Sequence, residues 1–296
     1  MKDARTKIIA VASGKGGTGK TTVSAHLAIH SARTHKTMLA DLDVEAPDTL
    51  GLFRSTERVG EPEPVRVAVP RFHEDRCTGC GLCAQSCRFG AIFAIGMVVT
   101  INEQLCKGCG RCVAVCPAAA LSEAPIVVGT TSLYKNGALD IIEGRMRIGD
   151  IRSTAVIEAA KQRTMEHEAE IQIRDCPPGV SCPATHAIAG ADYVVLVAEP
   201  TEFSLHDLKA AIELVQGNGI PAGVVVNKDG FGDADINGFC ELHAVPVIGR
   251  IAFNRDRAAS GAEGKLWEND ADFMEAINKV FNTALVTINR SAGGQS

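Results

Sequence analysis

A glycine-rich segment near the start of the chain contains residues that could bind phosphate. An apolar run at residues 8–12 precedes it and a helix-forming run at residues 23–33 follows it, so we expect it to connect a strand to a helix. In that place, backbone N–H groups and the helix N-terminus would point at one anion. Lys20 would reach the β- and γ-phosphates, and the Thr21 hydroxyl would bind Mg²⁺. The residues of this predicted triphosphate site are Gly14, Lys15, Gly16, Gly17, Thr18, Gly19, Lys20, Thr21 and Thr22.

Three of these glycines also match the G-x-G-x-x-G pattern of dinucleotide-binding proteins. Asp41 and Asp43 lie about where such proteins carry a ribose-binding carboxylate. The Lys20–Thr21 pair after the last glycine, however, is typical of triphosphate loops and has no role in a dinucleotide loop. We therefore favour the triphosphate site over the dinucleotide site and over an ordinary glycine turn.

Polar side chains end three other predicted strands. Asp43 ends the strand at residues 37–43, Asp175 ends the strand at residues 171–175, and Asn227 follows the strand at residues 222–226. The carboxyl ends of parallel strands face the ligand crevice of an α/β sheet. A carboxylate there can orient the attacking water or hold a magnesium-bound water, and an amide can contact a purine edge. The alternatives are solvated or proline-rich turns.

Eight of the eleven cysteines form two quartets with the same C-x2-C-x2-C-x3-C spacing. The first quartet is Cys77, Cys80, Cys83 and Cys87, and the second is Cys106, Cys109, Cys112 and Cys116. Because no secretory signal is apparent, the pattern predicts metal ligands rather than a disulfide framework. Zinc is the alternative, but its structural sites take four ligands from two pairs, which fits three closely spaced cysteines plus one poorly.

The double quartet resembles the two-cluster bacterial ferredoxins over residues 75–122. The resemblance implies two [4Fe-4S] clusters with crossed ligation. One cluster would be held by Cys77, Cys80, Cys83 and Cys116, and the other by Cys106, Cys109, Cys112 and Cys87. The sequence departs from the pattern at Arg88, because Pro117 stands at the corresponding place after the second quartet.

The phosphate loop, the acids near Asp43 and the Asp-Cys-Pro-Pro-Gly segment from Asp175 resemble the deviant P-loop ATPases of the MinD, ParA and nitrogenase-iron-protein superfamily. With the quartets set between these two strands, the chain is similar to members that carry an inserted ferredoxin domain. The resemblance implies an ATP-dependent dimer, either of two copies or with a paralogous ATPase, in which Lys15 reaches the partner's nucleotide. It also implies that Asp43 positions the attacking water and that Asn227 contacts adenine.

The order of predicted strands and helices indicates the fold class. The segment at residues 192–198 is almost wholly apolar, as in parallel sheets covered on both faces. We expect an α/β fold, a mostly parallel, doubly wound P-loop NTPase sheet with an inserted small α+β ferredoxin-like domain. The expected domains are 1–60, the first part of the ATPase domain, 61–124, the ferredoxin domain, and 125–296, the rest of the ATPase domain. A Pro/Glu-rich stretch at residues 60–64 marks the first boundary.

Composition argues against several other classes of protein. The formal net charge is -5 and the sequence has no dense Lys/Arg run, so we expect no nucleic-acid partner. The sequence shows neither a membrane-spanning apolar run nor an apolar leader, so we expect no membrane partner and a cytoplasmic location.

Together the motifs predict an ATP-binding and hydrolysing iron–sulfur protein with ATP, Mg²⁺ and two [4Fe-4S] clusters as cofactors. Nucleotide-dependent dimerisation would be coupled to electron transfer through the clusters to a redox partner that the sequence does not identify. The alternative is an iron–sulfur cluster carrier or assembly scaffold, or a MinD-like positioning factor with a redox-sensing ferredoxin module. Electron transfer is favoured because a carrier needs a labile, exposed cluster.

Two smaller signals also carry expectations. His26 and His30 stand one helical turn apart, and we expect them on a solvated helix face rather than in a metal site. We expect Cys182 to be a half-buried side chain that packs the helix after Asp175. The alternative for Cys182 is a ligand of a third cluster shared by two subunits.

Overall fold

The computed structural model describes residues 5–293, and the chain divides into two compact units. The first unit comes from the N-terminal part up to Pro62, from Thr131–Arg145, and from Ile157 onward. The second consists of Glu63–Thr130 and Met146–Val156. The strands β3 (Glu57–Phe72), β6 (Leu121–Asn136) and β7 (Leu139–Met146) contribute to both units.

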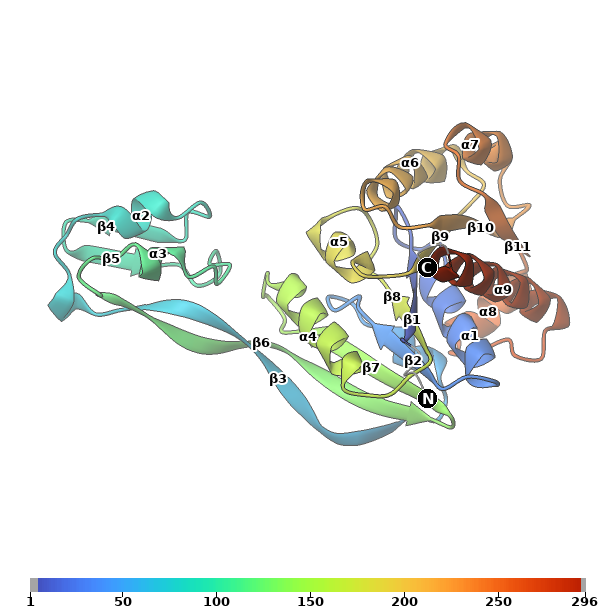
Figure 1. Cartoon of the computed structure of the whole chain (residues 1–296), viewed down its shortest axis with the longest axis horizontal. Coiled ribbons are helices and arrows are strands. Elements are labelled where there is room, and N and C mark those ends of the chain that lie inside the picture. The colour runs from blue at the N-terminus through green and yellow to red at the C-terminus, as the bar shows by residue number, and fades with distance from the viewer. Residues whose placement is uncertain (1–4, 294–296) are drawn as a thin grey trace. The chain divides into compact units, whose positions relative to one another are not determined.

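The first unit is built on a mostly parallel sheet (Figure 1). The order of the nine strands is β11-β10-β9-β1-β8-β2-β7-β6-β3, and every neighbouring pair from β11 to β7 is parallel. The remaining strands are β1 (Lys7–Ala12), β2 (Thr37–Asp41), β8 (Ile171–Asp175), β9 (Tyr193–Ala198), β10 (Ala222–Asp229) and β11 (Val247–Ala252). This arrangement confirms the predicted α/β class with a mostly parallel sheet.

Helices pack on both faces of this sheet (Figure 1). Helices α1 (Lys20–Ala32) and α9 (Ala271–Gly293) bury their apolar sides with Ile171 and Ile173 of β8. Gln172 and Arg174 alternate with these residues, so they face the opposite side. There they bond to α4 (Ser153–Met165) and to carbonyls at and just beyond the end of α5 (Cys182–Ile188). The other helices are η1 (Thr49–Leu52), α6 (Glu202–Gly217), α7 (Ile236–Leu242) and α8 (Arg255–Ala262).

The Pro/Glu-rich stretch at residues 60–64 lies inside a strand, and the two compact units divide within it, after Pro62. It forms part of β3, a strand of 16 residues at the end of the strand order. Proline cannot donate a hydrogen bond to a neighbouring strand, so it is tolerated chiefly on edge strands. The place of β3 at the end of the strand order therefore tolerates Pro62 and Pro64.

The second unit holds the eight cysteines of the two quartets. Besides its portions of the long strands it contains η2 (Glu74–Arg76), α2 (Leu82–Ser86), β4 (Ile92–Ile95), β5 (Val98–Ile101) and α3 (Arg111–Ala114). β4 and β5 form an antiparallel pair. Its interior consists of two small apolar clusters, one with Val69 and Cys106 and one with Ile92 and Cys112.

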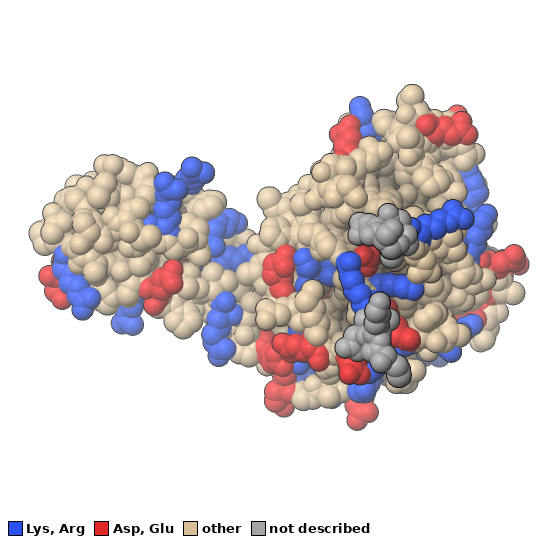
Figure 2. All heavy atoms as spheres, in the orientation of Figure 1, with Lys and Arg blue, Asp and Glu red and all other residues tan. Residues whose placement is uncertain are grey.

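Charged side chains of both signs are interspersed on the face of the molecule drawn in Figure 2. Their numbers, 30 Lys and Arg against 35 Asp and Glu, nearly balance over the chain. None of the helices in residues 5–293 is long and apolar enough to cross a lipid bilayer.

Candidate functional site

The glycine-rich segment connects β1 to α1 in the first unit, as the sequence predicts. Gly17 and Gly19 have φ angles of +80° and +89°, in the left-handed region that favours glycine. A Cβ on Gly19 would lie 2.2 Å from the Asn227 Nδ2 atom, so a larger residue has no room there. α1 begins at Lys20, and its first backbone N–H groups therefore point into the loop. The segment is shaped to surround an anion.

Lys20 is the buried cation of this loop. Its Nζ atom lies 3.4 Å from Asp175 Oδ1 and 3.9 Å from Asp43 Oδ2, and the residue is 6% exposed. Burial lowers the pKa of Lys20, but the neighbouring carboxylates of Asp175 and Asp43 outweigh it and raise the pKa overall. Lys20 therefore carries its charge at neutral pH and can pair with phosphate oxygens.

Two carboxyl groups, those of Asp43 and Asp175, flank this one ammonium group, and a third is close to Asp175. Asp41 and Asp175 lie side by side on β2 and β8, and Thr49 donates to both, from its N–H to Asp41 and from its hydroxyl to Asp175. Burial raises the pKa of Asp41 well above its usual range, and the charge of Asp175 adds to this. Burial likewise raises the pKa of Asp175, and it raises that of Asp43 to about 6. This excess of negative charge would be relieved by a divalent cation.

In the described part of the chain, no three His, Cys, Asp or Glu side chains converge on a point where one metal ion could bind. Nucleotide-bound Mg²⁺ commonly takes only one or two carboxylates and completes its shell with waters and phosphate oxygens. The Asp43 and Asp175 carboxylates and the Thr21 hydroxyl, which bonds to Asp175, are of the kinds that fit such a shell.

Lys15 and Lys228 share one carboxylate beside the loop. Glu199 lies 3.1 Å from Lys15 Nζ and 2.5 Å from Lys228 Nζ, and Lys228 also donates to the Gly17 carbonyl at 3.0 Å. The two ammonium groups lower the pKa of Glu199 against the opposing effect of its burial. Within one chain, the lysine expected to reach a partner's nucleotide is thus held by Glu199.

Asn227 lies on the other side of the loop and lines a pocket of about 260 Å³. Its Nδ2 atom donates to the Thr18 carbonyl at 2.7 Å, which leaves its carbonyl oxygen and one N–H free. The Thr18 hydroxyl is buried and has no hydrogen-bond partner within residues 5–293, as expected of a group that awaits a ligand. Other residues that line the pocket are Gly19, Thr22, Lys228, Phe253, Arg257 and Trp267. A pocket of this composition can accommodate a planar base.

Four residues beside the loop have no role predicted from the sequence, namely Lys228, Phe253, Arg257 and Trp267. Lys228 directly follows Asn227, and that adjacency is the one local signal for it. The other three belong to the segment after β11, far along the chain from the loop that they adjoin.

His26 does not lie on a solvated helix face, and that expectation is wrong. It is 1% exposed, its Nε2 accepts a hydrogen bond from the Trp267 backbone at 2.9 Å, and its Nδ1 donates to the Thr22 carbonyl at 2.7 Å. Burial lowers the pKa of His26 to about 4. The neutral ring thus ties α1 to the segment that carries Trp267.

The segment after Asp175 is bonded to the start of the phosphate loop. The Cys176 N–H donates to the Val11 carbonyl at 3.0 Å, and the Gly179 N–H donates to the Ser13 carbonyl at 2.9 Å. Cys176 is buried, and burial raises the pKa of its thiol to about 12. Cys182 is exposed rather than half-buried, because it begins α5 on the solvent side.

The two cysteine quartets of the second unit have nearly the same local structure. The N–H groups of Gly79 and Gly108 each donate, at 3.4 Å, to the sulfur of the first cysteine of their quartet. The N–H groups of Ala91 and Ala120 each donate, at 3.3 Å, to the sulfur of the fourth. Gly79 and Gly108 both have a φ angle of +69°. The internal repeat of the sequence is therefore also a structural repeat.

Cysteines of different quartets lie near one another. Burial raises the pKa of Cys83, and the neighbouring thiols that raise it further are those of Cys116 and Cys80. Cys87 packs against the small apolar cluster that contains Cys106. The fourth cysteine of each quartet therefore lies near a member of the other quartet.

Arg152 holds the loop that carries Cys106. Its side chain is 4% exposed, its Nη1 atom bonds both oxygens of Asp150 at 2.9 and 3.0 Å, and its Nε donates to the Cys106 carbonyl at 2.8 Å. Its Nη2 donates to the Glu103 carbonyl. All four residues belong to the second unit, although Arg152 follows β7 in the chain.

Comparison with known proteins relates the chain to nucleotide-binding proteins. Residues 9–267 match CbiA, the CobQ/CobB/MinD/ParA nucleotide binding domain. The uncharacterized protein MJ0579 of Methanocaldococcus jannaschii is 31% identical over 229 residues, or 77% of this chain and 82% of that protein. MJ0578 of the same organism is 32% identical over 243 residues, or 80% and 83%. The septum site-determining protein MinD of Pyrococcus horikoshii OT3, solved with Mg-ADP, has a TM-score of 0.58 at 18% identity over 99% of both chains, which shows a shared fold.

Proposed function

Because the chain belongs to the CobQ/CobB/MinD/ParA nucleotide-binding family, we propose that it is an ATP-hydrolysing iron–sulfur protein that couples nucleotide-dependent dimerisation to electron transfer. Members of the MinD/ParA type are nucleotide-binding ATPases. In our proposal, two [4Fe-4S] clusters occupy an inserted ferredoxin-like domain at residues 61–124. Residues 1–60 and 125–296 would supply the ATPase domain, except for residues 125–130 and 146–156, which belong to the second compact unit.

The proposed nucleotide site uses the residues around the phosphate loop. Lys20 pairs with the phosphates, Thr21 and Asp175 support Mg²⁺ through its hydration shell, and Asp43 orients the attacking water. Asn227 contacts the base. The position of Lys20 between Asp43 and Asp175 supports these roles, as does the unsatisfied Thr18 hydroxyl. The bound nucleotide supplies the phosphoryl group, and the protein contributes charge and orientation.

The proposed cluster ligands are the eight cysteines in crossed sets. The repeated N–H to sulfur hydrogen bonds support this, because such bonds stabilise thiolate ligands and tune the cluster potential. The nearness of Cys83 to Cys116 supports the crossed arrangement. In a cubane each thiolate binds a different iron atom, so the four sulfurs need not converge on one point, as they would for zinc. The repeated quartet is the observation that carries the iron–sulfur part of the proposal.

Metal analysis tests the cluster proposal directly. Protein purified without oxygen should contain about eight irons and eight acid-labile sulfides per chain, and Cys109→Ala should lower both. Cys240→Ala is a matched control, since that cysteine is buried in the first unit and belongs to neither quartet. Stoichiometric zinc, or about four irons in the unaltered protein, would contradict two clusters.

Lysine substitutions test the nucleotide site. Lys20→Ala should abolish ATP binding, since it removes the ammonium group between Asp43 and Asp175 that would pair with the phosphates. Lys15→Ala should still bind ATP but should neither dimerise with it nor hydrolyse it efficiently. Lys36→Ala serves as the control, because that side chain is 59% exposed and pairs with the exposed Glu168. ATP-dependent dimers of Lys15→Ala in sedimentation would contradict a cross-subunit role.

Coupling is tested by redox titration of the clusters with and without ATP. A shift of at least one cluster potential on ATP binding is expected, and it should be lost in Lys20→Ala. Identical potentials in both conditions would contradict the coupling while leaving the ATPase and the clusters in place.

A cluster-transfer role is a second candidate, favoured by one observation. Cys80 and Cys109 are exposed, so a cluster held there would be accessible to another protein. Incubation with an apo-ferredoxin distinguishes the roles. Electron transfer leaves iron bound to this chain, whereas transfer of a cluster moves iron and sulfide to the acceptor.

A further inference from the structure

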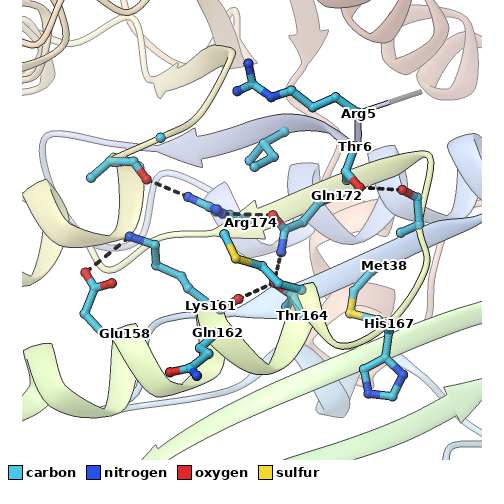
Figure 3. Close-up of a pocket in the computed structure, with 15 residues that line it drawn as sticks. Arg5, Thr6, Met38, Glu158, Lys161, Gln162, Thr164, His167, Gln172 and Arg174 are labelled. Carbon is cyan, nitrogen blue, oxygen red and sulfur yellow. Dashed lines mark hydrogen bonds and ion pairs between the residues drawn. The ribbon is translucent and has the colours of Figure 1, made fainter. Parts of the chain in front are cut away.

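A second pocket of the first unit lies on the sheet face covered by α4 and α5 (Figure 3). Its volume is about 590 Å³, within the range of roughly 300 to 1,000 Å³ that is usual for small-molecule sites. Its walls come from the first residues of β1, from β2 and β8, from α4, and from the chain just after α5. None of the phosphate-loop residues from Gly14 to Thr22 lines it, so it is separate from the nucleotide site.

Arg174 is a buried cation in this pocket without an acidic partner. The residue is 1% exposed. Its Nε donates to Gln172 Oε1 at 3.2 Å, and its Nη1 donates to the Ala187 and Ala189 carbonyls at 3.2 and 2.9 Å. Within residues 5–293, no carboxylate lies within 4.0 Å of it and no acceptor is bonded to its Nη2 atom. Burial lowers the pKa of Arg174, and the charges of Glu158 and Asp192 oppose this from beyond ion-pair distance. Arginine nevertheless stays protonated in proteins, so a charge without a bonded counter-charge remains in the pocket.

Lys161 is a second buried cation in the same pocket, and it is 8% exposed. Its Nζ atom donates to the His186 carbonyl at 2.7 Å and lies 3.2 Å from Glu158 Oε1. That carboxylate is half exposed and also bonds the His186 ring at 2.8 Å, so it is shared between two groups. One donor of the ammonium group has no partner in the described part of the chain.

The polar atoms beside these cations are fixed by a chain of hydrogen bonds, visible in Figure 3. Gln172 accepts from Arg174 and donates to the Thr164 hydroxyl, which in turn donates to the Lys161 carbonyl at 2.6 Å. The amide orientation of Gln172 is therefore determined, and the guanidinium group is held in one position. A preorganised arrangement of donors is what a ligand site requires.

Anchoring the end of α5 does not by itself account for both cations. The favourable interaction of a cation with a helix C-terminus is much weaker than the cost of burying that cation away from water. The other cation at the rim, Arg5, pairs with Asp192 at 3.0 Å and so adds little net charge. The pocket therefore keeps an excess of positive charge beside unused N–H donors.

We propose that this pocket binds a small organic anion whose carboxylate or phosphate oxygens lie between Lys161 and Arg174. Ile8 and Met38 line the apolar part of the wall and would contact its carbon skeleton. Oxygens of either acid accept the charge-assisted hydrogen bonds that these two side chains have left to donate. The ligand would lie against the end of α5, the helix that follows the Asp175 segment.

Calorimetric titration of the full chain with succinate and with inorganic phosphate tests this site. Saturating ADP and Mg²⁺ keep the phosphate loop filled. At least one anion should bind saturably, and the stronger of the two identifies the acid class. Lys161→Met, which keeps the aliphatic stem, should weaken binding about tenfold or more. The phosphate loop does not line this pocket. If the Lys161→Met variant lost only ADP binding, its affinity for the anion could therefore still be compared with that of the unaltered protein.

Gln162→Glu provides a variant that does not threaten folding, because this pocket-lining side chain is exposed. The added carboxylate should weaken anion binding several-fold. Gln104→Glu changes the net charge equally but lies in the second unit and should leave binding unchanged. No saturation by either anion up to about 10 mM, or equal affinity in all three variants and the unaltered protein, would overturn the proposal.

Discussion

Replacement of Arg152 by alanine should open the second unit locally. The guanidinium group bonds Asp150 through two oxygens, and it also bonds the Cys106 and Glu103 carbonyls. Loss of one partner of a buried ion pair costs about 3 to 5 kcal/mol when the other charge is left unpaired. The Asp150 side chain is 0% exposed but would keep its bond to Arg147, so the expected cost lies near the lower end of that range.

Arg147 offers a matched comparison, because it bonds the same carboxylate. Its Nη2 atom donates to Asp150 Oδ2 at 3.1 Å, but its side chain is 57% exposed. An exposed ion pair contributes only about 0 to 1 kcal/mol. The two alanine variants thus remove the same kind of group from the same acid and differ mainly in burial.

Hydrogen exchange measures the difference without requiring any cofactor. Amides of residues 103–116 should exchange about a hundredfold faster in Arg152→Ala than in the unaltered protein, and less than about fivefold faster in Arg147→Ala. Amides of β9 in the first unit should be unaffected. Equal exchange of residues 103–116 in the two variants would refute the reasoning, since burial would then make no difference to the value of the pair.

Three further outcomes are expected. The pKa of His26 is lowered to about 4 from an unfolded value of 6.5, so between these pH values the unfolded chain binds a proton that the folded chain does not. The free energy of unfolding should therefore fall by up to about 3 kcal/mol from pH 7 to pH 4. In denaturant titrations, the unfolding free energy of His26→Gln should depend less on pH. An alkylating reagent should label exposed Cys182 readily but not buried Cys176, whose pKa is raised to about 12, and labelling of both in the native protein would contradict the structure. Gly19→Ala should abolish nucleotide binding, since its Cβ would lie 2.2 Å from a side-chain amide at a φ of +89°, whereas Gly217→Ala, with open space around it, should bind normally.

The sequence predicted the sheet and the phosphate loop because their signals are local. A β-branched run, a glycine turn and a helix lie within 33 residues, and the buried strand β9 is almost wholly apolar. The two units divide after Pro62, within the Pro/Glu stretch, but local composition does not reveal that this stretch also lies in a strand at the sheet edge. Proline tolerance depends on that place and not on the neighbouring residues.

The errors and omissions at the candidate site come from contacts between distant segments. His26 meets Trp267 across 241 positions, so its helix gives no sign that the ring is buried. Arg152 stands 46 positions from the Cys106 carbonyl that it bonds. Arg174 and Lys161 have a similar cause, because an arginine within a strand and a lysine on a helix suggest solvent until the fold brings α5 over them.

The charge pairing around the phosphate loop explains how its two lysines can have different roles. Lys20 is the one ammonium group near Asp43 and Asp175 in the described structure, so its removal would leave buried carboxylates without a counter-charge. Lys15 differs, because Glu199 also binds Lys228 and would stay paired if Lys15 moved away. The side chains of Lys15 and Lys20 are 23% and 7% exposed, respectively. Lys15 can therefore leave its own chain at low electrostatic cost, as its proposed contact with a partner's nucleotide requires, whereas Lys20 is held in place.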